Sequence, residues 1–275
     1  MNGNTRTTGK EQFYTPVELA KSIVDEAKDL FDHLDNFLEP AGGSGAFIEA
    51  AKQIGFKNIV SYDIEPFHDL VSEGNFLDQD FEVNNFVTIS NPPFGRNNSL
   101  SIPFFNHAAK YSNLIGFIVP RSWRKWSVQN KLDSNFHLIK DQNIEINYVG
   151  LDLEPISNKG ILKTCIQFWK RKEEIRQKIQ VKDMSVIKKC KPNEANVSLT
   201  VFGHNYGKLE IGQDFKPNTT KMFFKTLHPK AIEALLIVDY SRFAENTAYI
   251  PALSIHEINY LLNEVLFLDP MLVRS

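Results

Sequence analysis

The sequence predicts an α/β protein with a largely parallel sheet that carries helices on both faces, followed by a small C-terminal α+β module. Two observations lead to this fold class. Short apolar runs alternate, in the first part of the chain, with segments whose apolar residues recur every three or four positions. A glycine-rich turn also stands between an early apolar run and such a helical segment. Alternating strands and helices are typical of a parallel sheet that is covered on both sides.

The predicted elements follow one another in a regular order. A helix is expected after Thr15 and Pro16, with Thr15 as its cap, because Leu19, Ile23 and Ala27 have helical spacing. Strands are expected at 35–38, 58–62, 86–90, 114–119, 143–150 and 161–169, and further helices up to about residue 54, after residue 66, at 104–111 and within 121–140. A short connection at 151–160 would make the last two strands antiparallel.

A change of pattern near residue 175 predicts two domains, 1–175 and 176–275. Residues 1–12 are expected to be disordered, and 170–191 to form a charged, partly helical connector. The smaller module is expected to contain strands at 197–202, 208–211 and 222–227 and a helix at 255–266. No internal repeat or low-complexity segment is apparent.

Composition narrows the classes of protein to consider. The 275 residues are 42% hydrophobic, include 21 Phe and carry a net charge of −2, so a substantial core can form. No apolar run approaches the roughly 18 residues of a membrane span, and the polar N-terminus does not resemble a secretory signal. Two cysteines exclude a disulfide framework and a Cys-rich zinc site. We therefore expect a cytoplasmic protein with neither membrane nor metal partners.

Basic residues gather in three places, which are 121–125, 170–178 and 188–191. Such clusters can follow a phosphate backbone, but ordinary solvated surfaces carry them too, and composition leaves both interpretations open.

The glycine turn suggests a nucleoside ligand that is bound without its phosphates. Gly43-Ser44-Gly45 allows close approach to the backbone, but Ile48 stands where the dinucleotide fingerprint needs its third glycine. No Gly-Lys-Ser/Thr of a phosphate-binding loop follows either. Asp63 lies 20 positions after Gly43 and ends the next predicted strand, where a carboxylate can accept both hydroxyls of a ribose. A purely structural turn and a helix-capping Asp are the alternatives.

The most informative stretch is Asn91-Pro92-Pro93-Phe94, which follows the predicted strand 86–90. Two prolines stiffen it and prevent both strand and helix from continuing. The amide oxygen of Asn91 and the carbonyl of Pro92 can each accept one hydrogen of an exocyclic base amine, which turns the nitrogen lone pair toward an electrophile. Phe94 can stack on the base, provided the base has left its helix. A proline turn with no catalytic role is the alternative.

In this order the motifs resemble the class I S-adenosylmethionine-dependent methyltransferases, and most closely the gamma-type N6-adenine DNA methyltransferases. The resemblance covers about residues 13–172 and implies a Rossmann-like, mostly parallel seven-stranded sheet, with S-adenosyl-L-methionine as cofactor. It implies that the cofactor is bound by Tyr14, Thr15, Pro16, Glu39, Ala41, Gly43, Gly45, Phe47, Asp63, Ile64, Asn75 and Phe76. Asn75 stands where the family has Asp, and its amide oxygen can still accept from the adenine amino group. Catalysis is assigned to Asn91, Pro92 and Phe94.

Substrate contacts are expected from Pro93, Arg96, Arg121, Trp123 and Arg124, although a solvated loop or half-buried packing would explain the same residues. The gamma arrangement implies that 1–175 binds cofactor and catalyses, while 176–275 is a target-recognition or accessory module.

The function expected from the resemblance is methylation of N6 of a flipped-out adenine, with DNA favoured over RNA as the nucleic-acid partner. Structured RNA is the first alternative, because Phe94-Gly95-Arg96-Asn97-Asn98 resembles ribosomal-RNA adenine methyltransferases. A glutamine methyltransferase, an N4-cytosine methyltransferase and an inactive nucleic-acid-binding subunit with this fold rank lower. A restriction enzyme or another partner subunit is compatible with this function.

Overall fold

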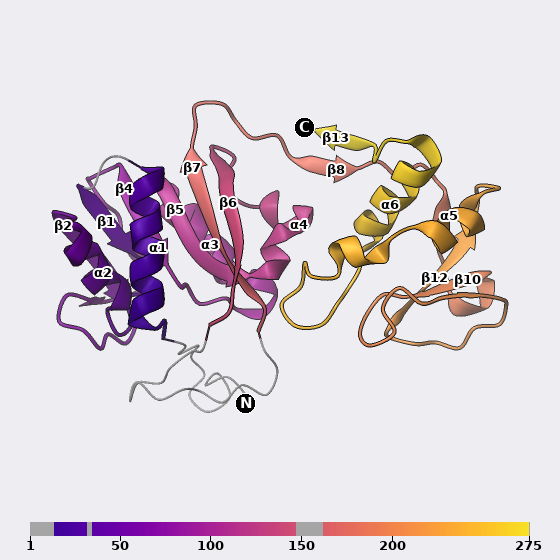
Figure 1. The fold of residues 1–275 in the computed structure, drawn as a ribbon, viewed down its shortest axis with the longest axis horizontal. Helices are drawn as coiled ribbons and strands as arrows, with labels where there is room; N and C mark the ends of the chain where they lie inside the picture. Colours follow the sequence, from indigo (N-terminus) through magenta and orange to yellow (C-terminus); the bar gives the residue numbers. More distant parts are fainter. Residues whose placement is uncertain (1–13, 32–34, 147–161, 275) are drawn as a thin grey trace. The chain divides into compact units, whose positions relative to one another are not determined.

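The computed structural model describes residues 14–31, 35–146 and 162–274. They form two compact units (Figure 1). The first unit takes its residues from 1–121 and 131–176, and the second from 122–130 and 177–275. The expectations for residues 1–12 and for the connection 151–160 lie outside the described residues.

The first unit is built on a seven-stranded sheet of order β3-β2-β1-β4-β5-β7-β6. Its strands are β1 Asn36–Glu39, β2 Asn58–Asp63, β3 Ser72–Glu73, β4 Phe86–Ser90, β5 Ser112–Pro120, β6 Phe136–Ile144 and β7 Thr164–Arg171. Strands β1 to β5 pair in parallel, and β7 lies antiparallel to both β5 and β6. This strand order, with one reversed strand next to the edge, is that of the Rossmann-like class I methyltransferase fold. The predicted fold class is therefore confirmed.

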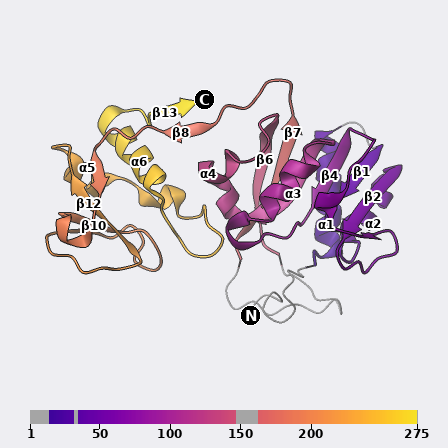
Figure 2. The ribbon, with the colours of Figure 1, turned by 180° about the vertical axis from the view of Figure 1, so that it is seen from behind.

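Helices cover both faces of this sheet. Helices α1 Val17–Leu30 and α2 Ala46–Ile54 lie on one face, which is in front in Figure 1, and α3 Ser101–Ala108 lies on the other, seen in Figure 2. On the first face, Ile23 and Val24 of α1 join a buried cluster with Ile89 of β4. On the second, the Phe105 ring packs edge-on against Phe117 and other aromatic rings.

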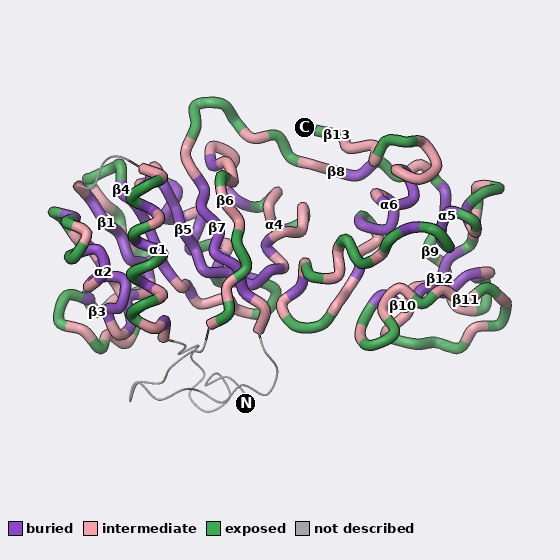
Figure 3. Tube along the Cα trace, in the orientation of Figure 1, coloured by how far each residue is buried: buried purple, intermediate pink, exposed green. Residues whose placement is uncertain are grey.

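The central strands β1, β4 and β5 are buried almost throughout, as Figure 3 shows. Strand β4 coincides with the predicted strand 86–90, and all of its residues are buried. Because β4 lies between two parallel neighbours under helices, both of its faces demand apolar or small side chains. Complete burial of one such large apolar side chain contributes roughly 1.5–3 kcal/mol.

The second unit has a four-stranded antiparallel sheet of order β11-β10-β12-β9, covered on one face by two helices. The strands are β9 Ile187–Lys189, β10 Val197–Thr200, β11 Leu209–Ile211 and β12 Lys221–Thr226, and the helices are α5 Ala231–Ile237 and α6 Ile255–Phe267. A short pair, β8 Ile179–Val181 and β13 Leu272–Arg274, and the helical turn α4 Trp126–Gln129 complete the unit.

Some predicted elements were wrong. Helix α1 begins at Val17 with Pro16 in the cap position and no side-chain cap, so Thr15 does not cap it. The helix expected after residue 66 is a turn, α3 ends at Ala108 rather than at 111, and the connector 170–191 contains strands and no helix.

The strand expected at 143–150 is β6, which begins at Phe136 and ends at Ile144, while 147–150 lie outside the described residues. As an edge strand, β6 is only partly buried, so its sequence lacks the apolar run that reveals a central strand. Within the described chain, no helix is both long and apolar enough to cross a membrane.

Candidate active site

Most of the candidate residues gather at the carboxyl edge of the parallel strands. Strand β1 ends at Glu39, β2 at Asp63 and β4 at Ser90. In the sheet, β1 lies between β2 and β4, so the chain leaves β1 toward one side and later returns on the other. Ligands of open α/β sheets bind at such a switch point. The glycine turn after β1 and the Asn91 motif after β4 flank this position.

The glycine turn has a conformation and surroundings that only glycine tolerates. Gly43 and Gly45 have positive φ angles of +47° and +81°. A Cβ atom on Gly43 would lie 2.9 Å from Cε1 of Tyr14, and one on Gly45 would lie 2.3 Å from Cδ2 of His68. A Cβ on Gly42 would meet the hydroxyl of Ser61 at 2.2 Å. The lack of Cβ atoms therefore lets the side chains of Tyr14, Ser61 and His68 lie directly against the backbone of the turn.

Asp63 is fixed by the backbone on both of its carboxylate oxygens. The amide of Gly43 donates to Oδ2 at 2.8 Å, and the amide of Glu65 donates to Oδ1 at 3.0 Å. Burial raises the pKa of Asp63, while these two hydrogen bonds oppose the rise. Each oxygen keeps acceptor capacity for one more donor. This arrangement suits a pair of vicinal hydroxyls.

Apolar and aromatic side chains lie beside this carboxylate. Ile64, which follows Asp63, is 56% exposed, and Phe67 is 43% exposed. The rings of Tyr14 and Phe67 meet edge to face with 6.1 Å between centroids. Burial, followed by the charges of Asp63 and Glu65, raises the pKa of Tyr14 to about 12. The Tyr14 hydroxyl is therefore a neutral donor at physiological pH.

Glu39 is a carboxyl group buried beneath the turn. It is 1% exposed, and its Oε1 accepts hydrogen bonds from the Ser90 hydroxyl at 2.5 Å and from the Ala41 amide at 3.4 Å. Oε2 is buried without a hydrogen-bond partner among the described residues. Burial holds the pKa of Glu39 well above its ordinary value, although the bond from Ser90 lowers it. A buried carboxyl oxygen with no partner is costly, and a cationic ligand group would satisfy it.

These residues fit S-adenosylmethionine. Asp63 offers a fixed carboxylate for a ribose, Ile64 an exposed aliphatic face for a purine, and the glycine turn a backbone without Cβ atoms. Glu39 offers an unpartnered acceptor for an ammonium group.

The Asn91 motif lies between β4 and α3. Asn91 and Phe94 are half-buried and Pro92 is buried. The Phe94 ring packs partly against the hydrophobic cluster under α1 and α2, and its carbonyl accepts hydrogen bonds from Leu100 and Ser101, both at 3.3 Å. The contact with the cluster holds the side chain of Phe94, and the two hydrogen bonds hold its backbone. The residue is only half-buried, so part of it stays accessible.

The loop after the motif is tightly wound. Gly95, Asn97 and Asn98 have φ angles of +66°, +56° and +63°. A Cβ on Gly95 would lie 2.6 Å from the hydroxyl of Ser99. Asn98 is buried, whereas Arg96 is exposed. The loop therefore turns back so that the amides of Leu100 and Ser101 reach the Phe94 carbonyl, and Arg96 is exposed to solvent.

Asn75 and Phe76 have structural tasks in this structure. Asn75 Oδ1 accepts from the Leu77 amide at 3.2 Å, and its Nδ2 donates to Asp78 at 2.9 Å. These bonds cap the 3-10 helix Phe76–Asp78. The Phe76 ring is 1% exposed and packs edge-on against His107 at 4.8 Å. A second lone pair of Asn75 Oδ1, the second hydrogen of its Nδ2 and backbone groups are left for a ligand.

The remaining cofactor candidates differ in accessibility. Phe47 is 5% exposed inside the hydrophobic cluster, so its side chain contributes packing. Thr15 is buried, while Pro16 and Ala41 are half-buried.

The candidate substrate residues differ in exposure. Trp123 has no exposed surface, so the expectation that it lines a substrate cleft was wrong. Arg121 is 9% exposed, and its Nε donates to the carbonyl of Thr164 in β7 at 3.3 Å. Arg124 and Pro93 are half-buried.

Sequence reasoning missed His68 and Ser90. The Leu70 amide donates to Nδ1 of His68 at 3.2 Å, which leaves Nε2 to carry the proton toward Glu49 at 3.1 Å. The ring covers Gly45. His68 belongs to no motif, and Ser90 appeared only as the last residue of a strand, so neither showed its role in the sequence.

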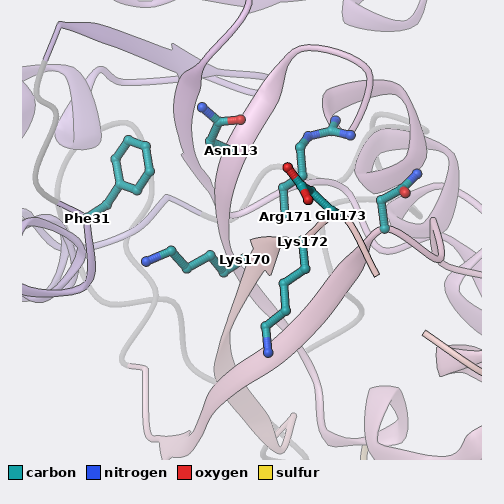
Figure 4. Close-up of a pocket in the computed structure, with 7 residues that line it drawn as sticks. Phe31, Asn113, Lys170, Arg171, Lys172 and Glu173 are labelled. Carbon is teal, nitrogen blue, oxygen red and sulfur yellow. The ribbon is translucent and has the colours of Figure 1, made fainter. Parts of the chain in front are cut away.

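A cavity of about 400 Å³ lies at the opposite edge of the sheet (Figure 4). Asn113 at the start of β5 and Lys170 at the end of β7 contribute to its wall. Two cations of its wall already have partners: Lys170 donates to the carbonyl of Leu30 at 3.3 Å, and Arg171 to that of Ser112 at 2.9 Å. The cavity therefore belongs to the scaffold rather than to the candidate site. Among the described residues no group of three or more His, Cys, Asp or Glu side chains could hold a metal ion.

The comparisons with known proteins give a partial relationship. No family model matches the chain. Over 101 residues, which are 33% of this chain and 18% of the relative, it is 29% identical to the type II methyltransferase M.HincII of Haemophilus influenzae. M.HindII, a type II methyltransferase of Haemophilus influenzae strain Rd, matches over the same length with 29% identity. The matched part thus spans about a fifth of the length of these relatives.

Solved structures show weaker likeness. A type I restriction-modification methyltransferase subunit from Streptococcus thermophilus has 16% identity and a TM-score of 0.44, covering 66% of this chain and 49% of that chain. The 23S rRNA methyltransferase ErmE has 16% identity and a TM-score of 0.42, covering 59% and 71% of the two chains. Scores this low do not establish a relationship, and the fold class rests on the strand order.

Proposed function

We propose that this chain transfers the methyl group of S-adenosylmethionine to the N6 amino group of adenine in DNA. The observation that carries the proposal is the placement of Asn91-Pro92-Pro93-Phe94 across the switch point from the glycine turn, with Ser90 hydrogen-bonded to Glu39 between them. The partial homology to the type II methyltransferase M.HincII supports a methyltransferase of the restriction-modification type.

The cofactor would supply, when bound, a methyl group on a positively charged sulfur. Asp63 would accept from the ribose hydroxyls, and Ile64 would cover one face of the adenine. Glu39 would face the ammonium group of the methionine part with the oxygen that has no partner in the described structure. Tyr14, packed on Gly43, would close this end of the site.

Asn91 and Pro92 would act on the target amine. Their two oxygens would each accept one amino hydrogen, which reduces delocalisation of the nitrogen lone pair into the base. Orientation and electrostatics would then supply the catalysis, without a strong base before transfer. Phe94, held on its inner side by the core, would stack on the base after it has left the duplex, a step that costs a few kcal/mol.

The second unit would recognise the target. It comprises 177–275 together with 122–130 and has its own hydrophobic core. A separate core allows such a unit to present a surface of its own to nucleic acid.

The test is to incubate the full chain with methyl-labelled S-adenosylmethionine and matched duplex DNA, single-stranded DNA, structured RNA and protein, and then to analyse the digested products by mass spectrometry. We expect labelled N6-methyladenine from DNA. Label in RNA adenine, in cytosine or in glutamine would redirect the substrate assignment. Absence of both cofactor binding and label on all substrates would contradict the proposal.

A further inference from the structure

The four-stranded sheet of the second unit has one face under helices and one face without them. Val197 of β10 and Phe224 of β12 lie opposite each other and belong to the core under α5 and α6. Residues that alternate with these point to the other face. They include Lys221, Phe223 and Lys225 of β12, Ser198 and Thr200 of β10, Glu210 of β11 and Lys188 of β9.

Two lysines stand directly opposite each other on this outer face. Lys225 of β12 is the register partner of Lys188 of β9, and both are exposed. Like charges directly opposite each other destabilise an antiparallel pair. Neither side chain has an ion-pair or hydrogen-bond partner among the described residues.

Elsewhere on this outer face, lysine side chains form ion pairs with a carboxylate. Lys221, at the other end of β12, donates to Glu210 at 2.5 Å, and Lys208 reaches the same carboxyl group at 3.7 Å. Lys188 and Lys225 form no such close ion pair among the described residues, although Glu194 lies near enough to act on Cys190 together with both lysines. An anionic ligand would relieve this repulsion between Lys188 and Lys225.

A hollow of about 360 Å³ adjoins the lysine pair along β12. Phe223 lines it and is supported by the Phe215 ring at 5.9 Å. Its other walls are Pro192, Pro217, Asn218, Thr219 and Lys221. Apolar rings with amide and hydroxyl groups beside cations suit a sugar-phosphate chain, since most contacts to such a chain come from Lys, Asn, Ser and Thr.

We propose that this outer face, defined by Lys188, Lys225 and the hollow beside Phe223, binds the phosphate backbone of the nucleic-acid substrate. The inference rests on the proposed function and assigns a surface to its substrate. The two lysines have Cβ atoms about 5 Å apart, as opposite residues of a pair do. A duplex offers one negative charge per roughly 1.7 Å of its axis, so both ammonium groups find phosphates at once.

The test compares charge-matched variants of the full chain. Binding of fluorescent duplex DNA is measured by anisotropy over a salt series for the wild type, for Lys188→Gln/Lys225→Gln and for Lys182→Gln/Lys230→Gln. The control pair removes the same charge from the same unit, at two exposed lysines, of which Lys230 directly precedes helix α5 on the covered side of the sheet. We expect the first variant to lower the slope of log affinity against log salt by about 2, and the control to leave it nearly unchanged.

Two further measurements keep the outcomes separate. The melting temperature of Lys188→Gln/Lys225→Gln should equal or exceed that of the wild type, because the repulsion is removed, and cofactor binding should not change. Equal salt slopes for both variants, or no binding of DNA by the wild type, would overturn the assignment of this face. If the wild type methylates DNA while the lysine variant does so equally well, the surface is wrong and the proposed function stands. If neither cofactor binding nor methyl transfer occurs, the proposed function itself fails.

Discussion

At the scale of single residues, Glu39 and Ser90 connect the two halves of the candidate site. Ser90 is the last residue of β4 and immediately precedes Asn91, while Glu39 ends β1 and begins the glycine turn. Their hydrogen bond is buried and 2.5 Å long. A shift of Glu39 would therefore be transmitted through Ser90 to the backbone of Asn91. The carboxyl group has both a structural partner and a buried oxygen with none among the described residues.

Glu39→Gln is predicted to change how stability depends on pH. Burial raises the pKa of Glu39 in the folded chain only, so the folded state holds more protons above the ordinary pKa of the group. The free energy of unfolding then falls as pH rises through this interval. The variant, which does not titrate at this position, should lose less stability than the wild type as the pH rises above the ordinary pKa of a glutamate. Melting temperatures over this range provide the measurement.

Glu210→Gln is the control for this comparison. The pKa of Glu210 is lowered, first by its hydrogen bond from Lys221, so this carboxylate stays charged throughout the interval. Its replacement should shift the level of the stability curve but not its slope. Parallel curves for Glu39→Gln and the wild type would show that Glu39 is ionised in the folded chain.

Asn91→Ala is predicted to lower methyl transfer at least a hundredfold, because an acceptor that orients the amine is lost; removal of one such group typically costs roughly 10²–10³ in rate. The cofactor affinity, measured by calorimetry, should stay within about twofold of the wild type. Asn143→Ala, at an exposed position of the edge strand β6, is the matched control. Full activity of Asn91→Ala would rule out the amide as acceptor.

At the scale of elements, the glycine turn, α2 and the segment after β2 are held together at one point. The His68 ring lies against Gly45, and the Phe67 amide donates to the carbonyl of Gly43 at 3.0 Å. Glu49 of α2 holds the far side of the His68 ring. Whatever enters the turn must therefore share space with His68.

A double-mutant cycle tests this contact. Gly45→Ala is predicted to destabilise the chain through its positive φ angle, by about 1 kcal/mol, and further through the clash with His68. His68→Ala removes the clash but not the backbone strain. The double variant should therefore be more stable than the sum of the two single effects, as measured by denaturant unfolding. Additive effects would mean that His68 moves away from Gly45 without cost.

The elements that the sequence revealed are those with a uniform environment. Strand β4 is buried on both faces, and α6 carries a buried stripe under a Ser254–Glu257 capping box, so each shows a clear pattern. The edge strand β6 has mixed burial and a polar sequence, which explains its misplaced boundaries. The same holds for the candidate site. Residues at strand ends, such as Asp63, could be predicted from the order of the motifs along the sequence. The contact of His68 with Gly45 could not, because it exists only after the chain has folded.

At the scale of the whole molecule, the chain passes between its two units three times, after 121, after 130 and after 176. The inserted segment 122–130 packs within the second unit. The Trp126 ring lies 5.4 Å from that of Tyr260 and 5.8 Å from that of Phe243. Lys125 donates to both carboxylate oxygens of Glu257, at 2.9 Å and 2.8 Å. A basic residue that sequence reasoning placed in a cluster for phosphate is thus used inside the unit.

The ion pair between Lys125 and Glu257 makes the inserted segment essential to the second unit. Glu257 is 3% exposed and also caps α6 through Ser254, so its charge is buried. Removal of one partner from a buried pair costs roughly 3–5 kcal/mol, whereas replacement of both is often neutral. We therefore predict that Lys125→Met strongly destabilises the second unit, and that Lys125→Met/Glu257→Gln recovers most of the loss.

Thermal unfolding and limited proteolysis of the full chain distinguish these variants. Lys178→Met, at an exposed lysine of the same unit, controls for the loss of one charge. Lys125→Met should expose cleavage sites in 177–275 while cofactor binding by the first unit persists, because the glycine turn and Asp63 belong to that unit. Nucleic-acid binding should fall with the second unit. If Lys125→Met behaves as Lys178→Met does, the inserted segment is only a connection, and the second unit owes its stability to 177–275 alone.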